Sequence, residues 1–427
     1  MEVARKTRWT ELSSLFYLAT RSWFWLLCAD IYPVLVAACI PWSTTGVAIF
    51  VSVWVFVLVP TLDPRLFLQS LKSPASSLPL AFFALAVIGT LWADGPWLAS
   101  LHGIGPVTKL LAIPLLLYHF ERSQRGHWVF LAFLISCALL MGLSWITIFA
   151  PDWKITETGA AGVPVKNYID QSQEFGLCIL ALASLILALF DQRRLALATL
   201  CAALMSAFFA NMMFVASSRT ALIFMPVLLI LFAIRHLKRG TMLLLFAGTV
   251  AAATLIWFTS PYLRQRVEHV AVEYREYSEI NRPTSTGLRL EYWRASLKSI
   301  SEAPLFGHGT GSTKELFDRE AEGKVGAWAK SITNPHNQTL YVAVQWGALG
   351  CVVLYAMWYF HILLFRERSF VGWIGLLVVV QNIVSSLLNS HLFDFHEGWI
   401  YVLGVGVAGG IATKAAKAPK NGPKLIA

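Results

Sequence analysis

The sequence predicts an all-α integral membrane protein with about twelve transmembrane helices and one large polar segment. Three observations support this fold class. Apolar residues make up 57% of the 427 residues, and charged residues make up only 14%. Runs of roughly 17 to 25 apolar residues, the length that crosses a bilayer as a helix, recur from one end to the other. Only residues 261–335 form a long polar stretch.

We expect twelve hydrophobic spans, of which the second, fourth and eighth are somewhat short. They cover residues 23–40, 46–59, 78–92, 107–117, 128–149, 175–189, 196–216, 221–234, 242–258, 339–364, 371–388 and 399–411. The chain is then expected to have four parts. These are transmembrane helices 1 to 9 (residues 1–260), the polar segment with amphipathic helices (261–335), transmembrane helices 10 to 12 (336–413) and a basic tail (414–427).

Lysine and arginine are unevenly distributed between the two sets of alternate turns. One set of turns carries Arg65, Lys72, Arg122, Arg125, Arg193, Arg194, Arg235, Lys238, Arg239, Arg366 and Arg368. Both chain ends are also basic and belong to the same side. The short turns of the other set hold only Lys154, Lys166 and Arg219, with Lys109 near the end of the fourth span. The positive-inside rule therefore places both termini in the cytoplasm and the polar segment outside. The net charge of +10 suits anionic lipid and is no evidence for nucleic-acid binding.

Several classes of site find no support in the sequence. The six cysteines fall in or beside predicted spans and form no CxxC pair, which argues against a disulfide framework and a thiolate metal site. No stretch resembles a P-loop, a dinucleotide fingerprint or a zinc-protease helix. We see no internal repeat, so the chain is expected to be one membrane domain with a large insertion.

The polar segment has helical periodicity of its own. Apolar residues spaced by three and four from Leu263 to Tyr277 predict an amphipathic helix near the headgroups. A second periodic stretch, 288–300, places Arg289 on one stripe with Trp293. Glycines then alternate at 307, 309 and 311, so that main-chain N–H groups can approach an anion closely; Gly307 and Gly309 are candidate substrate-binding residues. A short polar helix is expected from 313 to about 322.

The end of the polar segment carries the candidate base. Asn334 and Pro335 are expected to be the N-cap and the first helical residue of the tenth span. His336 would then lie in the first helical turn, where the helix dipole disfavours a positive charge and keeps the imidazole neutral. A neutral imidazole can act as a general base. The alternative is an interfacial histidine with a structural role. The neighbouring Asn337 is a candidate to bind the substrate.

Two arginines and a lysine are further candidates. Arg219 lies in Ser217-Ser218-Arg219-Thr220, between the seventh and eighth spans. An arginine at membrane depth is costly unless it is paired or lines a hydrated cavity, although it also has the option of extending to the headgroups as an anchor. Arg289 has a weaker local case, because most arginines on a loop helix are solvated. Lys166, with Gln171 and Glu174, is expected beside an outer cavity, where Lys166 is a candidate to bind the substrate.

The last outer turn contains His391, Asp394, His396 and Glu397, a composition that metals accept. Their spacing fits no fixed ligand pattern, and the interleaved Leu392, Phe393, Phe395 and Trp399 favour an aromatic belt at the membrane surface. We therefore expect no metal site.

The motifs together resemble those of the O-antigen ligase and polymerase superfamily of bacterial envelopes. The resemblance rests on the number of spans and the single outer segment after the ninth. It also rests on four motifs, which are Ser217-Ser218-Arg219-Thr220, Leu288-Arg289-Leu290-Glu291-Tyr292-Trp293, Pro304-Leu305-Phe306-Gly307-His308-Gly309 and Pro335-His336-Asn337. Each motif is short, and their order and common outward position make the match specific. In motif the resemblance covers only about residues 217–338.

The resemblance implies a GT-C-like fold and glycosyl transfer on the periplasmic side of the bacterial inner membrane. The implied donor is an undecaprenyl-diphosphate-linked glycan, and in the ligase branch the acceptor is lipid A–core. No nucleotide, metal or other cofactor is implied. The family's catalytic histidine corresponds to His336 and its two arginines to Arg289 and Arg219. Such residue types suit the reaction, because arginine binds phosphate oxygens and a histidine base activates a sugar hydroxyl.

Three other functions stay open at the level of the sequence. A transporter of twelve spans is expected to show two similar halves, which this chain lacks. A metal-dependent lipid-sugar glycosyltransferase is expected to have acidic residues in its first outer loop, whereas residues 41–45 contain none. An O-antigen polymerase or a protein O-oligosaccharyltransferase would use the same donor and is the nearest alternative.

Overall fold

The structure is a computed structural model that describes residues 20, 22–157, 160–216, 218–330 and 332–418. These residues form helices and turns without any β-strand, so the predicted all-α fold is confirmed. Ser217 of the predicted Ser-Ser-Arg-Thr motif lies outside the described residues, as do 419–427 of the predicted basic tail.

Ten helices of the described chain are long and apolar enough to cross a membrane, as a multi-pass membrane protein requires. They are α3 (Thr44–Leu58, extended by one turn to Thr61), α5 (Pro74–Ile88, extended by one turn to Trp92), α6 (Trp97–Thr108) continued by α7 (Ala112–Phe120), α8 (His127–Phe149), α9 (Tyr168–Asp191), α10 (Leu195–Phe214), α11 (Arg219–His236), α12 (Arg239–Thr259), α16 (Gln338–Leu364) and α18 (Phe395–Lys417). Two shorter apolar helices, α2 (Trp23–Cys39) and α17 (Phe370–Ser385), correspond to the remaining predicted spans. A short helix, α4 (Pro64–Ser70), connects α3 to α5.

Helix α18 lies at the centre of the bundle, against α7 and α17. Its glycines permit this position, because a Cβ at Gly406 would lie 2.4 Å from the Leu116 side chain and one at Gly410 would lie 2.8 Å from the Phe120 main chain. Small residues allow membrane helices to approach closely where the hydrophobic effect provides no driving force between them. The first turn of α18 is thereby fixed relative to the other helices.

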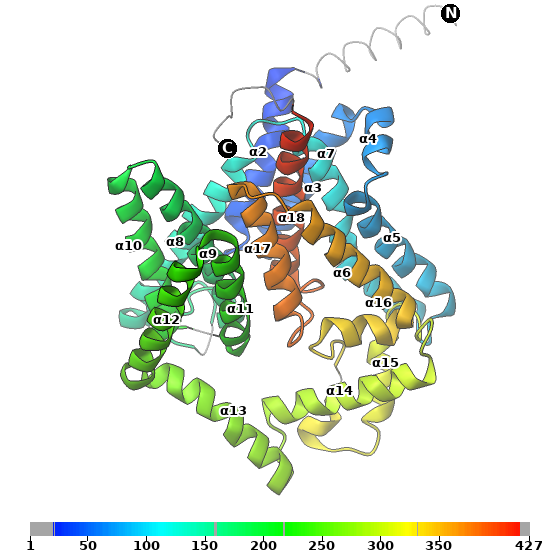
Figure 1. Cartoon of the computed structure of the whole chain (residues 1–427). Helices are drawn as coiled ribbons and strands as arrows, with labels where there is room; N and C mark the ends of the chain where they lie inside the picture. The colour runs from blue at the N-terminus through cyan, green and yellow to red at the C-terminus, as the bar shows by residue number, and fades with distance from the viewer. Residues whose placement is uncertain (1–19, 21, 158–159, 217, 331, 419–427) are drawn as a thin grey trace, which may run out of the picture.

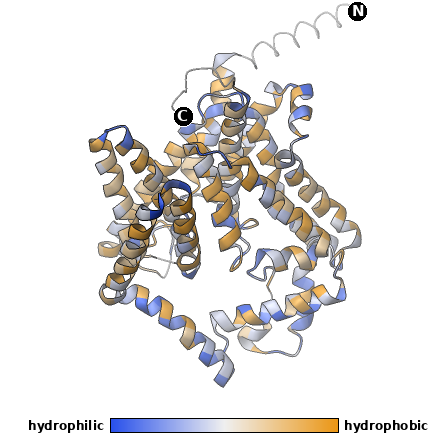
Figure 2. Ribbon diagram, in the orientation of Figure 1, coloured by the Kyte–Doolittle hydropathy of each residue, from blue (hydrophilic) through white to orange (hydrophobic). Residues whose placement is uncertain are grey.

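The polar segment forms three helices at one end of the bundle, α13 (Pro261–Ile280), α14 (Ser285–Glu302) and α15 (Thr313–Glu320). The start of α2 and the end of α18 lie at the opposite end (Figure 1). Blue and white residues are concentrated in these three helices, in contrast to the orange bundle (Figure 2). All three predicted helices of the segment are therefore confirmed.

Helices α13 and α14 form a hairpin whose turn follows from its sequence. Asn281 ends α13 in the left-handed conformation (φ 50°), which asparagine tolerates better than most residues. The Thr284 hydroxyl caps α14 by accepting a hydrogen bond from the Gly287 amide (3.1 Å). Gly287 lacks a Cβ that would lie 2.5 Å from the Tyr277 ring. The two helices can therefore pack closely at the turn.

Residues 304–312 are joined directly to a break in α16. The break lies at Gly347 (φ 58°), where the helix leaves main-chain groups unpaired. The Val344 and Gln345 carbonyls accept hydrogen bonds from the His308 and Gly309 amides at 2.9 and 2.8 Å, and the Ala348 amide donates to Pro304 O (2.8 Å). A polar loop is thus bonded to the main chain of a transmembrane helix, which fixes α14 relative to α16.

Candidate active site

His336 lies just before α16 and not within its first turn, which corrects the predicted helix start. Asn337 is the N-cap of α16, and its side-chain oxygen accepts from the Leu340 amide (3.0 Å). Asn334 instead accepts from the His336 amide (2.8 Å) and the Ser390 hydroxyl (2.7 Å). These bonds hold His336 in the left-handed conformation (φ 56°). Pro335 precedes the helix, so neither Asn334 nor Pro335 has the predicted role.

Asn389, in the turn between α17 and α18, contacts both catalytic candidates from the polar segment. Its amide oxygen lies 3.2 Å from His336 Nδ1 and 3.5 Å from a terminal nitrogen of Arg289. Trp293, one turn along α14 from Arg289, donates to Pro335 O (3.1 Å), and the Tyr292 ring stacks near the imidazole with centroids 6.4 Å apart. Three separate parts of the chain therefore meet around His336.

The contact with Asn389 assigns the tautomer of His336. An amide oxygen only accepts hydrogen bonds, so the imidazole Nδ1 must donate a proton to it. Nε2 then carries the lone pair. Burial and the positive charge of Arg289 lower the pKa of His336 below its usual 6.5. A neutral ring with a free Nε2 is the form that a general base requires.

Arg289 is half-buried and its charge is largely uncompensated. In the part of the chain that the structure describes, no carboxylate forms an ion pair with its guanidinium. Burial, together with the nearby positive charge of Arg219, lowers the pKa of Arg289. A guanidinium that retains donors and lacks a counter-charge is suited to bind an anion.

Arg219, in contrast, already has a carboxylate partner. Both terminal nitrogens donate to Glu273 of α13, at 2.8 and 2.6 Å, in a bidentate pair. The Thr286 hydroxyl also donates to this carboxylate (2.6 Å). The Arg219 guanidinium and the Thr286 donors hold the pKa of Glu273 at about 2. Glu273 was not predictable from the sequence, since one glutamate in a helix with several acidic residues carries no signal.

The alternating glycines have a different physical role from the predicted one. The Gly307 amide donates to Ala303 O (3.0 Å), that of Gly309 to Gln345 O (2.8 Å) and that of Gly311 to the Gln345 side chain (2.7 Å). A Cβ at Gly307 or Gly309 would lie within 2.5 Å of another main chain. The glycines thus permit close packing, and their N–H groups are already used within the protein.

Lys166 and Asn337 also take structural roles in this conformation. The half-buried Lys166 ammonium donates to the Ile40 carbonyl at the end of α2 and lies within electrostatic range of Glu174 and Glu397. The Asn337 amide group donates to Leu387 O (3.0 Å) in addition to capping α16. Neither side chain joins the group formed by His336, Arg289 and Asn389, so their predicted contacts with substrate find no support in this geometry.

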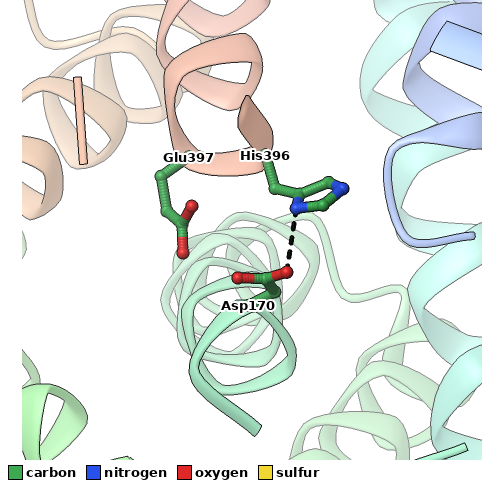
Figure 3. Close-up of side chains that lie close together, drawn as sticks. All are labelled: Asp170, His396 and Glu397. Atoms are coloured by element: carbon green, nitrogen blue, oxygen red, sulfur yellow. Dashed lines mark ion pairs between the residues drawn. The ribbon is translucent and has the colours of Figure 1, made fainter. Parts of the chain in front are cut away.

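A buried polar cluster lies at the start of α18. Asp170 from the first turn of α9 pairs with His396 (Oδ2 to Nδ1, 2.8 Å), and the carboxylate of Glu397 lies beside them (Figure 3). His391 and Leu392 are fully buried and Phe393 is 7% exposed, so the predicted aromatic belt at the membrane surface is wrong. Asp170 was not among the predicted residues, because it is separated from Glu397 by more than half the chain.

The class of protein that these features define is a multi-pass helical membrane protein with histidine and arginine side chains gathered beneath one polar helical segment. A sequence model of the family described as O-antigen ligase matches residues 204–355, which extend from α10 to the middle of α16. The predicted resemblance to the O-antigen ligase superfamily is thereby confirmed. The match includes Arg219, Arg289 and His336 and supports an enzyme of the O-antigen ligase or polymerase type.

A second protein that is similar to this chain gives no information about its function. A protein of Haemophilus influenzae described as uncharacterized is 29% identical over 132 residues, which are 30% of this chain and 33% of that protein. The alignment therefore covers about a third of either protein.

Proposed function

We propose that the protein is a periplasmic glycosyltransferase that moves an O-antigen glycan from undecaprenyl diphosphate to lipid A–core. The O-antigen ligase match over 204–355 supports the general reaction. The contact of Arg289 and His336 with the same residue, Asn389, is the structural observation that carries the proposal. It brings an anion-binding group and a base together, as transfer from a diphosphate carrier to a hydroxyl requires.

Arg289 is the proposed diphosphate-binding residue. The leaving group departs as an anion, so it needs positive charge and hydrogen-bond donors more than it needs a proton. Arg289 has donors available and no carboxylate partner among the described residues. Arg219 supplies positive charge from nearby, but its guanidinium can bind the diphosphate only after Glu273 releases it. The two arginines therefore have different tasks in the proposal.

His336 is the proposed base. Its Nε2 accepts the proton of the acceptor hydroxyl while the oxygen attacks the anomeric carbon of the donor glycan. The bond between that carbon and the phosphate oxygen breaks, and its electron pair leaves with the diphosphate. A single in-line displacement inverts the anomeric configuration. In this proposal the arginines provide the positive charge at the leaving group, and no metal ion takes part in the transfer.

The proposed orientation follows from the lysine and arginine distribution, with both termini cytoplasmic and the segment 261–335 periplasmic. Lipid-linked substrates would enter sideways between helices, with their glycans beneath α13 and α14. The nearest alternative is an O-antigen polymerase, because it uses the same donor and the same chemistry on a different acceptor.

Deletion of the gene, followed by gel analysis of envelope glycolipids, tests the proposal. Loss of a ligase leaves lipid A–core unmodified while long glycan accumulates on its carrier. Loss of a polymerase leaves core that bears a single repeat. An unchanged glycolipid pattern contradicts both. Complementation with wild-type protein should restore the pattern, and complementation with His336→Ala should not.

A further inference from the structure

Three side chains from the starts of two helices converge within the bundle. Asp170 lies in the first turn of α9, and His396 and Glu397 lie in the first turn of α18 (Figure 3). One potential ligand atom from each residue lies within 4.8 Å of the other two. Asp170 and Glu397 are each 7% exposed. Their carboxylates are thus held together away from bulk solvent.

Polar atoms without partners surround these three side chains. His391 is fully buried, neither of its ring nitrogens has a hydrogen-bond partner in the structure, and its Nδ1 lies 3.6 Å from Glu397 Oε1. Both amide atoms of the buried Asn382 are likewise unpaired. A cavity of about 10 Å³ adjoins Glu397 and Asn382, which is roughly the space that one water molecule or ion needs. Buried polar groups are rarely left unpaired, so the region is suited to a polar occupant.

The charges of the cluster are unbalanced. Asp170, Glu397 and the adjacent Glu174 are three buried carboxylates, whereas only two ammonium groups of the described chain lie near them: Lys166 is within electrostatic range of all three, and Lys109 is within range of Glu397. The dipoles at the starts of α9 and α18 offset only part of the excess. Buried charges need partners, because burial of an isolated carboxylate costs several kcal/mol or more. Bound protons or one divalent cation would restore neutrality.

We propose that Asp170, His396 and Glu397 bind one divalent transition-metal ion, with His391 as a candidate fourth ligand. One or two imidazoles with two carboxylates form a donor set that suits Zn²⁺, whereas Mg²⁺ and Ca²⁺ prefer oxygen ligands alone. In a tetrahedral site, bonds to Zn²⁺ of about 2.0 to 2.2 Å place ligand atoms about 3.3 to 3.6 Å apart, so ligand atoms that lie up to 4.8 Å apart need to close by up to roughly 1.5 Å.

The ion would connect α9 to the first turn of α18 and so fix the turn that carries Asn389. That turn holds the imidazole of His336 and lies against Arg289. The ion is a structural element in this proposal and makes no contact with the glycan or the diphosphate. The proposed metal binding and the proposed transferase activity can consequently be tested independently of each other.

Metal content of the full-length protein in detergent tests the proposal. The protein is purified through a tag that does not require immobilised metal, and bound elements are measured by mass spectrometry. Wild-type protein should carry about one Zn²⁺ per chain, and chelator-treated protein should regain it on titration with Zn²⁺ and unfold at a higher temperature. Less than about a tenth of an ion per chain, with no saturable Zn²⁺ binding, overturns the proposal.

Variants separate the site from adventitious binding. Asp170→Asn and Glu397→Gln should each weaken Zn²⁺ binding by on the order of a hundredfold, and His396→Cys should retain Zn²⁺ because a thiolate is also a zinc ligand. The matched control is Asp30→Asn, which alters another buried Asp–His pair (Asp30 to His119, 2.8 Å). Undiminished Zn²⁺ binding in Asp170→Asn contradicts the assignment. If that variant does not fold, the wild-type titration decides the question.

Discussion

His336 is held in a conformation that histidine rarely adopts. A positive φ costs a residue with a Cβ about 1 kcal/mol or more, and such strain is concentrated at functional sites. Here the cost is offset by the bonds of Asn334 to the His336 amide and to Ser390. The strained main chain aims the imidazole at Asn389, which fixes its tautomer. The position and tautomer of the proposed base are thus set by Asn334, which precedes α16, and by Asn389 and Ser390, which follow α17.

The first prediction concerns pH. Because burial and Arg289 lower the pKa of His336, kcat/KM should fall as the pH drops through an inflection below 6.5 and should be flat above it. Arg289→Gln removes the repulsive charge, so the inflection of its residual activity should move upward. Arg289, His391 and Tyr292 are charged or titratable groups that lie near the imidazole. A kcat/KM that does not fall on acidification below pH 6.5 would argue against His336 as the base.

The second prediction concerns the geometry of Arg289. Arg289→Lys keeps the charge but loses the planar pair of donors that matches two phosphate oxygens. We expect kcat/KM for the lipid-linked donor to fall on the order of tenfold, which corresponds to about 1.4 kcal/mol. Arg294→Lys, an exposed position on the same helix, is the control and should retain activity. Equal activity of both variants would remove Arg289 from the diphosphate site.

At the scale of elements, α14 and α16 are held together by main-chain bonds between residues 304–312 and the break at Gly347. This joint sets the position of Arg289 relative to His336, because Arg289 lies on α14 and His336 lies two residues before the start of α16. A glycine-rich loop next to a catalytic segment is often a ligand-binding loop. Here it is a rigid connection between a polar helix and a transmembrane helix.

A third prediction follows from this joint. A Cβ at Gly309 (φ 86°) would lie 2.3 Å from the Ala93 main chain, whereas one at Gly326 (φ 63°) would meet nothing within 4 Å. Both substitutions incur the backbone cost of about 1 kcal/mol, and only Gly309→Ala adds a clash. Thermal unfolding should therefore show a clearly lower Tm for Gly309→Ala than for Gly326→Ala. Equal Tm values with a selective loss of donor binding would instead favour the anion-binding role.

A fourth prediction concerns the pair that joins α11 to α13. Glu273→Gln weakens the bidentate contact and should cost about 1 kcal/mol of stability, since the pair is only partly exposed. It also releases the Arg219 donors, so KM for the donor should fall several-fold if Arg219 binds the diphosphate. Glu276→Gln, on the same helix, breaks the exposed pair with Arg282 and serves as the control. A rise in KM for Glu273→Gln alone would contradict this role of Arg219.

For the whole molecule, local patterns predicted the helices well. Length and apolar content sufficed for the spans, and spacings of three and four sufficed for α13 and α14. The start of α16 was predicted three residues too early, because Asn334-Pro335 and Asn337-Gln338 both fit a helix start. Asn334 instead forms a contact with Ser390, more than fifty residues away, and the helix begins after Asn337. Local sequence contains no information about such a contact.

The site was only partly predictable for the same reason. His336, Arg289 and Arg219 were selected mainly because their motifs resemble those of the family, and in the structure Asn389 contacts both His336 and Arg289. Asn389, Glu273 and Asp170 had no distinguishing neighbours, and each acquires its role through a partner distant in the chain. The anion-binding role of the glycine loop stays a prediction, because in this conformation the Gly309 and Gly311 amides are paired with Gln345 of α16.

Transfer of glycan by purified protein, with lipid-linked donor and lipid A–core acceptor, tests the central claim that His336 is the base. His336→Ala should lower kcat by roughly a hundredfold to ten-thousandfold with little change in KM for the donor. His308→Ala, whose imidazole bonds to Asp94 and Ser299 away from His336, is the control and should keep its activity if the protein remains folded. A wild-type rate for His336→Ala would contradict the account.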